Sequence, residues 1–296
     1  AYGIRIPGTK GLQSHGVPGF IFKHTQEFFP NDLNSLERVL RANSLRGGTA
    51  AVMLEPIGPE SGTRPVDFDF PAGVRKLCDK YGALLIFDEV VTGFRISNGG
   101  AQEYFGVMPD LTIFGKVVAG GYPGAGAMGG KREFMKYLGS GLDDHGSKKA
   151  LVGGTLAATP LSCCAGYHTI CEIERTGACG KAAHIGDLLT DGLNALIDKR
   201  KLPFVAYNVG SVCHLDTVGT MHFAIRWSKP WQIPGILKQT SLRKKEMQHI
   251  GAAYMAEGLV TLAGNRMYTS AAYTEEDVGR ALSAFDRVFE KIEVIE

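Results

Sequence analysis

The sequence predicts an α/β protein in which a mainly parallel central sheet is flanked by helices and followed by a smaller C-terminal α/β domain. Three observations lead to this prediction. Short apolar runs alternate with amphipathic stretches up to about residue 170, these runs end in polar residues, and the pattern changes beyond Glu172. A length of 296 residues suits one large and one smaller domain. We therefore expect a large domain over residues 1–172 and a small domain over residues 173–296.

The elements of the large domain follow from local spacing. Asn31-Asp32 precede apolar residues at helical intervals, which predicts a capped helix beginning at Leu33. Because the carboxyl ends of parallel strands meet at one edge of a sheet, polar residues that follow the strands are expected to form the site. The other expected elements are a helix at Phe70–Tyr81 and strands at Phe20–Lys23, Thr49–Leu54, Ala83–Phe87 and Leu111–Phe114.

The small domain mixes longer helical stretches with strand-like runs and carries no obvious chemistry of its own. Its expected helices lie around Ile185–Lys199, Ser241–Glu257 and Glu275–Lys291, and its expected strands at Val212–Thr217, His222–Trp227 and Leu259–Ala263.

Composition and charge favour a small-molecule partner. The net charge is +2, and the charges are spread without a basic block or an acidic tail, so neither nucleic acid nor a membrane surface is expected as a partner. No stretch reaches the roughly 18 consecutive apolar residues of a membrane span. Six cysteines without a C-x-x-C spacing favour reduced thiols in a cytoplasmic protein over a disulfide framework or a zinc site, and we expect no bound metal.

The most specific local feature is a carboxylate and a lysine at the ends of successive strands. Asp88 follows the strand Ala83–Phe87, and Lys116 follows the strand Leu111–Phe114. Pyridoxal phosphate chemistry needs this pair, because a lysine amine forms an imine with the cofactor aldehyde and a carboxylate keeps the pyridine nitrogen protonated. The same two residues would also occur if Asp88 only capped a turn and Lys116 were an ordinary solvated surface lysine.

Four motifs strengthen the first interpretation. They are Glu55-Pro56-Ile57, Asp88-Glu89-Val90-Val91-Thr92-Gly93-Phe94-Arg95, Gly115-Lys116-Val117-Val118-Ala119-Gly120-Gly121 and Gly154-Thr155. In this order and at this spacing the chain resembles the class III aminotransferases of pyridoxal phosphate (PLP) fold type I. The segment Ser270–Val278 further resembles the branch that contains glutamate-1-semialdehyde aminomutase and some β-amino acid aminotransferases. The resemblance, which runs from Asn31 onward, implies PLP as cofactor and amino transfer from an amino acid or amine to an oxo acid through a Lys116 Schiff base.

The resemblance also implies roles for individual residues. Lys116 corresponds to the Schiff-base lysine and Asp88 to the partner of the pyridine nitrogen, so these are the expected catalytic residues. Val90 is expected to pack on the ring face, and Glu55 to support Asp88 from behind. Thr155 matches a threonine that reaches the cofactor phosphate of the neighbouring subunit, which implies a homodimer. A Gly-Gly-Thr turn without this role would look the same locally.

Glu60 and Arg266 are candidate substrate-binding residues. Glu60 lies five positions after Glu55, where the resemblance to ornithine-type enzymes places a glutamate that pairs with a C-terminal arginine and releases it for a substrate carboxylate. Arg266 is the matching arginine, expected in the loop after the strand Leu259–Ala263, and a guanidinium can bind a carboxylate with two hydrogen bonds. An exposed arginine in an ordinary ion pair is the competing interpretation.

Three departures qualify the resemblance. The glycine-rich segment that binds the cofactor phosphate, and the aromatic residue on the other ring face, are expected upstream of Ala1. The chain, which does not begin with Met, thus resembles the C-terminal two-thirds of a longer enzyme. Val91 stands where ornithine-type enzymes have a glutamine, which argues against that branch.

Other interpretations stay open. An aminomutase, which moves an amino group within one molecule, would use the same residues and need no added acceptor. The segment Gly124–Gly129 fits the G-x-G-x-x-G pattern of a nicotinamide-dependent oxidoreductase, but we expect it to be a strand of small residues rather than a turn that opens a helix. His145 beside Asp143-Asp144 fits a polar loop better than a metal site. A catalytically inactive protein that keeps the PLP fold is the remaining alternative.

Overall fold

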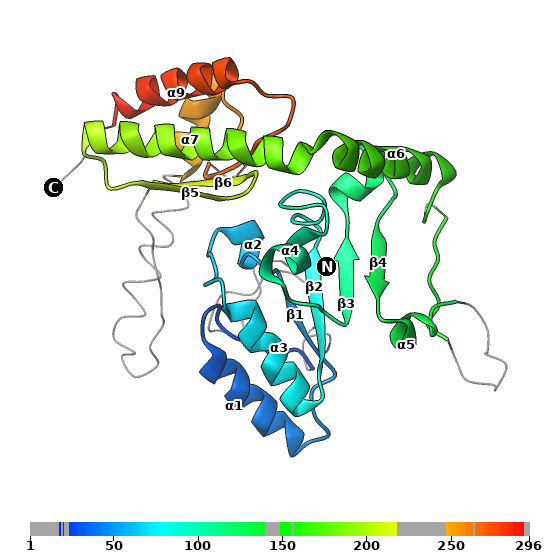
Figure 1. Cartoon of the computed structure of the whole chain (residues 1–296). Helices are drawn as coiled ribbons and strands as arrows, with labels where there is room; N and C mark the ends of the chain where they lie inside the picture. The colour runs from blue at the N-terminus through cyan, green and yellow to red at the C-terminus, as the bar shows by residue number, and fades with distance from the viewer. Residues whose placement is uncertain are drawn as a thin grey trace.

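The computed structural model describes residues 18, 20, 24–139, 149–155, 157–217, 247–262 and 264–292. Within these residues there are two separate sheets (Figure 1). One has four strands in the order β1-β2-β3-β4, and the other has three in the order β5-β6-β7. The prediction of an α/β protein with a mainly parallel sheet is confirmed.

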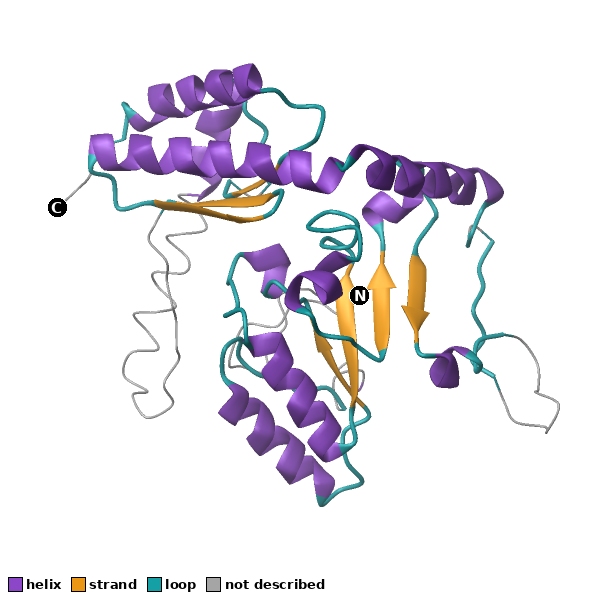
Figure 2. Ribbon diagram, in the orientation of Figure 1, coloured by secondary structure: helices purple, strands orange, loops and turns teal. Residues whose placement is uncertain are grey.

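The first sheet is parallel except at its last strand. Strands β1, β2 and β3 run parallel, and β4 runs antiparallel to β3. The register places Leu54 beside Phe87 and Asp88 beside Ile113. In Figure 2 the arrowhead of β3 points toward the long helices of the molecule, and that of β4 points away from them. The strands are β1 (Ala51–Leu54), β2 (Leu84–Glu89), β3 (Leu111–Phe114) and β4 (Ala127–Gly130).

Helices α1 (Leu33–Ser44) and α3 (Phe70–Tyr81) pack together on one side of this sheet (Figure 1). Asp32 caps α1, as the sequence predicts, because its carboxylate accepts the N–H of Ser35 at 2.8 Å. The bounds of α3 match the predicted helix, which ends at Gly82 with a left-handed φ of 67°.

Alternation along β2 decides which of its side chains reach the core. Leu85, Phe87 and Glu89 are fully buried, whereas Ile86 and Asp88 are only half-buried. Successive side chains of a strand point to opposite faces, so Asp88 lies on the face opposite Phe87. Burying a side chain such as Leu85 or Phe87 stabilises the fold by about 1.5–3 kcal/mol.

The second sheet is antiparallel and packs against α7 and α9 (Figure 1). Leu193 of α7, Leu215 of the sheet and Phe285 of α9 are all buried in one core. A capping box between Thr274 and Asp277 begins α9. The elements are α7 (Ala178–Arg200), β5 (Val205–Val209), β6 (Val212–Asp216), β7 (Arg266–Tyr268) and α9 (Glu275–Phe289).

Helix α6 (Pro160–Thr176) connects the two parts. Only Gly177, whose φ is 64°, separates it from α7, and the two helices run nearly end to end across the molecule (Figure 1). None of the helices that the structure describes is long and apolar enough to cross a membrane. The short elements are α2 (Pro59–Gly62), α4 (Gly100–Phe105), the 3₁₀ helix η2 (Lys116–Ala119) and α5 (Arg132–Met135).

The prediction of a strand at Leu259–Ala263 is wrong for its described residues. Gly258, with a φ of 84°, ends the helix that covers residues 247–256, and the chain then leaves the core. Val260 is 84% exposed, and Leu262 pairs only with Arg266 in a tight turn. Apart from this pair, no neighbouring strand among the described residues pairs with residues 259–262, and an apolar run without such partners does not form a strand.

Several other expectations also differ from the structure or fall outside it. The strand of small residues predicted at Gly124–Gly129 is observed as Ala127–Gly130. Helix α6 and strands β5 and β7 are not predicted by the sequence pattern. The strand at His222–Trp227, residues 21–23 of the strand at Phe20–Lys23, residues 241–246 of the predicted helix Ser241–Glu257, and the His145 loop lie outside the described residues.

Candidate active site

Asp88 and Lys116 lie at the same edge of the first sheet. Asp88 is the penultimate residue of β2, and Lys116 follows the end of the neighbouring parallel strand β3 by two positions. The backbone N–H of Val90 donates to Asp88 Oδ1 at 3.1 Å. We call this C-terminal end of β1, β2 and β3, with Glu55, Asp88 and Lys116, the site edge. The expected juxtaposition of Asp88 and Lys116 at the ends of neighbouring strands is therefore present.

Lys116 has an unusual backbone and an uncommitted amine. Its φ of 50° is left-handed, which costs a non-glycine residue about 1–2 kcal/mol. The side chain is exposed, and no residue in the described part of the chain makes a hydrogen bond or ion pair with its Nζ. Strained backbone of this kind persists only where its surroundings hold it, and it is concentrated at functional sites.

Close packing against α6 supplies those surroundings. A Cβ at Gly166 of α6 would lie 2.1 Å from the carbonyl oxygen of Val118, and a Cβ at Gly120 would lie 2.5 Å from the carbonyl carbon of Ala165. Only glycine therefore lets η2 and α6 approach this closely. Helix η2, which begins with Lys116, is therefore held in close contact with α6.

Val90, which follows β2 directly, makes contacts next to both predicted catalytic residues. A Cβ at Gly115 would lie 3.2 Å from Val90 Cγ1, so the Val90 side chain lies against the residue that precedes Lys116. Its backbone meanwhile binds Asp88. The apolar Val90 surface is thus beside both strand ends.

The carboxylate of Glu55 is held by two amides and lies near Asp88. It accepts the N–H of Glu60 at 3.1 Å and that of Ser61 at 2.8 Å. Glu55 follows Leu54, which is beside Phe87, so continuing the register brings Glu55 next to Asp88. Burial raises the pKa of Glu55, the charge of Asp88 adds to this rise, and the two amide hydrogen bonds oppose it.

The amides that hold Glu55 belong to a strained turn. The φ values of Glu60 and Ser61 are 55° and 58°, so two successive non-glycine residues of α2 are left-handed. Consecutive N–H groups in such a conformation form a concave binding site for an anion. Here the anion is the Glu55 carboxylate.

Arg266 reaches Glu60 through the backbone. Arg266 begins β7 instead of lying in a loop after a strand, which corrects the expected context. Its Nη1 donates to the carbonyl oxygen of Glu60 at 3.1 Å, whereas the Glu60 side chain is exposed. The buried Nε of Arg266 has no hydrogen-bond partner among the described residues. The structure thus brings the two residues together without a carboxylate–guanidinium pair.

Thr155 is not joined to the site edge within one chain. It lies in the exposed stretch 151–155, and no hydrogen bond links it to the other described residues.

Sequence reasoning missed the buried acid Glu89. It is 0% exposed, and its carboxylate accepts from Thr92 Oγ1 at 3.0 Å, from the N–H of Ala101 at 2.5 Å and from Gln102 Nε2 at 3.2 Å. A negative charge at the start of α4 is favourable, because the first N–H groups of a helix have no partner within it. Successive side chains of β2 alternate between its two faces, and this alternation could have indicated that Glu89 shares the buried face of Phe87 while Asp88 does not.

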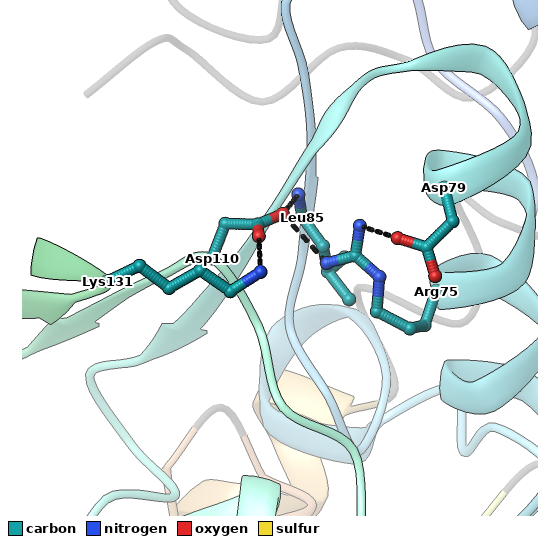
Figure 3. A network of polar contacts seen from close by, with 5 residues as sticks. All are labelled: Arg75, Asp79, Leu85, Asp110 and Lys131. Carbon is teal, nitrogen blue, oxygen red and sulfur yellow. Dashed lines mark hydrogen bonds and ion pairs between the residues drawn. The ribbon is translucent and has the colours of Figure 1, made fainter. Parts of the chain in front are cut away.

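The opposite end of the first sheet holds a saturated ionic network (Figure 3). Asp110, just before β3, accepts from Lys131 Nζ at 2.6 Å, from Arg75 Nη1 at 2.7 Å and from the N–H of Leu85 at 2.7 Å. Arg75 also pairs with Asp79 at 2.7 Å. Burial opposes ionisation of Asp110, but the three donors outweigh it and lower its pKa.

The glycine-rich segment Gly124–Gly129 lacks the context of a dinucleotide site. Such a site needs a strand, a glycine turn and then a helix. Here the segment continues into β4, which pairs antiparallel with β3.

Known proteins share both sequence pattern and fold with this chain. The profile of the family described as Aminotransferase class-III matches residues 17–272. An omega-transaminase from Sphaerobacter thermophilus matches with a TM-score of 0.78 at 24% identity, over 95% of this chain and 60% of that one.

Two further solved structures have the same fold. A transaminase with PLP bound has a TM-score of 0.71 at 22% identity, over 88% of this chain and 56% of that one. A β-phenylalanine aminotransferase from Variovorax paradoxus has a TM-score of 0.67 at 22% identity, with the same coverage of 88% and 56%. This chain therefore spans less than two thirds of the length of the solved chains that it matches.

Proposed function

Because the chain belongs to the class-III aminotransferase family, whose members depend on PLP, we propose that it acts as an aminotransferase with Lys116 and Asp88 as catalytic residues. One observation carries the proposal. The unpartnered amine of Lys116 and the carboxylate of Asp88 lie at the ends of neighbouring parallel strands. Open α/β sheets bind their ligands at this edge.

The residues at the site edge fit PLP. A carboxylate suits a protonated pyridine nitrogen, an amine without a partner suits an aldehyde, and Val90 offers an apolar surface beside both. Glu55 would add a further acid next to Asp88.

When bound, PLP supplies an aldehyde that condenses with an amine and a ring that accepts electrons from the substrate. Asp88 would bind the pyridine N–H and keep that nitrogen protonated. Lys116 would hold the cofactor covalently and, once a substrate amine displaces it, would take a proton from the substrate carbon and return it as general base and acid. Val90 and Glu55 would orient these groups.

The substrates in this proposal are an amino acid or amine as donor and an oxo acid as acceptor. Arg266 would bind a substrate carboxylate once its guanidinium turns away from the Glu60 carbonyl, because its buried Nε has no hydrogen-bond partner among the described residues where it now lies. Replacing Arg266 with Ala should lower the specificity constant for an amino acid, relative to its decarboxylated amine, by about 10- to 150-fold. An equal loss for both substrates would contradict this role.

We extend the proposal to assembly and organisation. A homodimer in which Thr155 serves the neighbouring subunit's cofactor would account for an exposed threonine without a contact to its own site edge. The main cores of the two sheets are separate clusters, which supports a division into residues 1–172 and 173–296 with the boundary inside α6. Six free cysteines support a reducing compartment such as the cytoplasm.

Covalent labelling tests the proposal directly. The full chain is incubated with PLP, reduced with borohydride and mapped by peptide mass spectrometry. We expect the pyridoxyl label on Lys116, no label in Lys116→Ala and an undiminished label in the matched control Lys131→Ala. Amino transfer by Lys116→Ala should fall by about 10²–10⁴-fold. A label on another lysine, or transfer that survives in Lys116→Ala, would contradict it.

A further inference from the structure

Three side chains of the second sheet form one row across its strands. Tyr207 of β5 is the cross-strand partner of His214 of β6, which is in turn the partner of Arg266 of β7. The Tyr207 and His214 rings stack with their centroids 5.0 Å apart and their planes at 13°. We call these residues the sheet row.

The sheet row binds carbonyl groups of four consecutive residues in the first part of the chain. Arg266 Nη1 donates to the oxygen of Glu60 at 3.1 Å. His214 Nε2 lies 2.9 Å from the oxygen of Ser61. The Tyr207 hydroxyl lies 3.2 Å from the oxygens of both Gly62 and Thr63, to which it can donate in turn.

His214 can only be a donor in this arrangement. A carbonyl oxygen accepts, so Nε2 carries the proton, and the buried Nδ1 has no partner among the described residues. His214 is 2% exposed, and a Cβ at Gly62 would lie 3.4 Å from its Nε2. The ring therefore fits closely against the turn.

The amides of the same turn face the opposite way, toward the site edge. Glu60 and Ser61 keep their left-handed backbone while their N–H groups bind the Glu55 carboxylate, next to Asp88. A turn with two strained residues relaxes unless contacts on its other side hold it. The sheet row makes those contacts.

We propose that the sheet row is a positioning device for the site edge, with His214 at its centre: by holding the carbonyls of residues 60–63 it keeps the turn in the form that binds Glu55 beside Asp88. The inference rests on the proposed aminotransferase function for its effect on turnover. His214 and Tyr207 act through the turn and Glu55, and neither is a catalytic residue.

Two His214 variants separate the hydrogen bond from the packing. His214→Phe keeps an aromatic ring against Tyr207 and loses the donor, whereas His214→Gln loses the ring and keeps a donor. The first readout is hydrogen exchange at the amides of Glu60 and Ser61 in the full chain without cofactor. In His214→Phe we expect these amides to exchange at least about 10-fold faster, since one hydrogen bond is worth roughly that factor, while amides of α7 keep their rates. His214→Gln should restore slow exchange.

The second readout is turnover of the PLP-loaded enzyme. His214→Phe should lower kcat several-fold with KM unchanged, and His214→Gln should recover it, whereas a general loss of stability would not be rescued selectively. His184→Phe, at an exposed position of α7, is the matched control and should change neither readout. If His214→Phe does not fold, Tyr207→Phe removes only a hydroxyl and should speed the same exchange by a smaller factor.

The two proposals fail separately. Unchanged exchange of the Glu60 and Ser61 amides in His214→Phe, or in Tyr207→Phe if the first variant does not fold, would overturn the positioning role. Faster exchange with unchanged kcat would also overturn it, because the turn would then not matter for the site edge. Faster exchange in His214→Phe, together with no amino transfer by the wild-type chain, would instead contradict the proposed function and leave the positioning of the turn standing.

Discussion

The two ends of the first sheet hold aspartates of opposite character. Asp110 is 3% exposed and accepts from Arg75, Lys131 and the Leu85 amide. Asp88, at the other end, accepts only the Val90 amide, and no cation of the described residues pairs with it. The Asp110 carboxylate is therefore paired within the fold, whereas the Asp88 carboxylate is available to a ligand.

The lysines differ in the same way. Lys131 is fixed to Asp110 at 2.6 Å in ordinary backbone geometry, and Lys116 combines a left-handed backbone with a free amine. A fold keeps such a strained and unpaired group only where surrounding contacts, here those of η2 with α6, over-determine it. Three substitutions at the two ends, and one at His214 of the second sheet, test this contrast.

The largest effect is expected from Asp88→Asn. Loss of its charge should reduce kcat by about 10²–10³-fold, the usual consequence of removing one group that stabilises charge in a transition state. The urea concentration of half-unfolding should stay at the wild-type value, because no ion pair is lost. A variant that is destabilised but fully active would reverse the assignment of the two ends.

Asp110→Ala should produce the complementary result. It leaves the buried Leu85 amide without its acceptor and takes from Arg75 one of its two carboxylate partners, so we expect a loss of about 3 kcal/mol in the free energy of unfolding. Labelling of Lys116 by PLP and borohydride should persist at temperatures where the variant is folded. Selective loss of the label with normal stability would show that the network serves the site directly.

The pH dependence of stability tests the burial of His214 near the site edge. Burial lowers the pKa of His214 to about 4, against an ordinary value of 6.5. The unfolded chain therefore binds this proton first, and the folded state should lose up to about 3 kcal/mol of stability as the pH falls from 6.5 to 4. His214→Gln should lack this part of the loss in urea titrations, while His249→Gln, at an exposed position, should keep it. Equal pH slopes for His214→Gln and wild type would contradict the prediction.

The smallest effect is expected from Lys131→Ala. The Lys131 side chain is 48% exposed, and a pair of this kind contributes about 0–1 kcal/mol. Thermal unfolding should therefore move by only a few degrees, and less in high salt. A loss as large as that of Asp110→Ala would mean that Lys131, and not Arg75 or the Leu85 amide, dominates the network.

Much of the first part of the molecule was predictable because its signals are local. The helix at Phe70–Tyr81 and the strand at Leu111–Phe114 have the predicted bounds, since apolar periodicity and terminal glycines act within a few residues. The strand predicted at Leu259–Ala263 is not formed by its described residues, because an apolar run pairs with another strand only where it can be buried. Strand β7 was not predicted because Arg266-Met267-Tyr268 is too short to show the two-residue alternation of a strand.

By itself the sequence determined helix α3, strand β3 and the place of Asp88 and Lys116 near the ends of neighbouring strands, because each depends on neighbours along the chain. Only the tertiary structure decided that the start of α4 supplies the N–H groups that bind the Glu89 carboxylate, and that Arg266 binds a carbonyl of Glu60 instead of its carboxylate. It alone joined His214 to Ser61, 153 positions away. A backbone carbonyl has no residue-specific signature, so its partner is known only when the two sheets are placed in space.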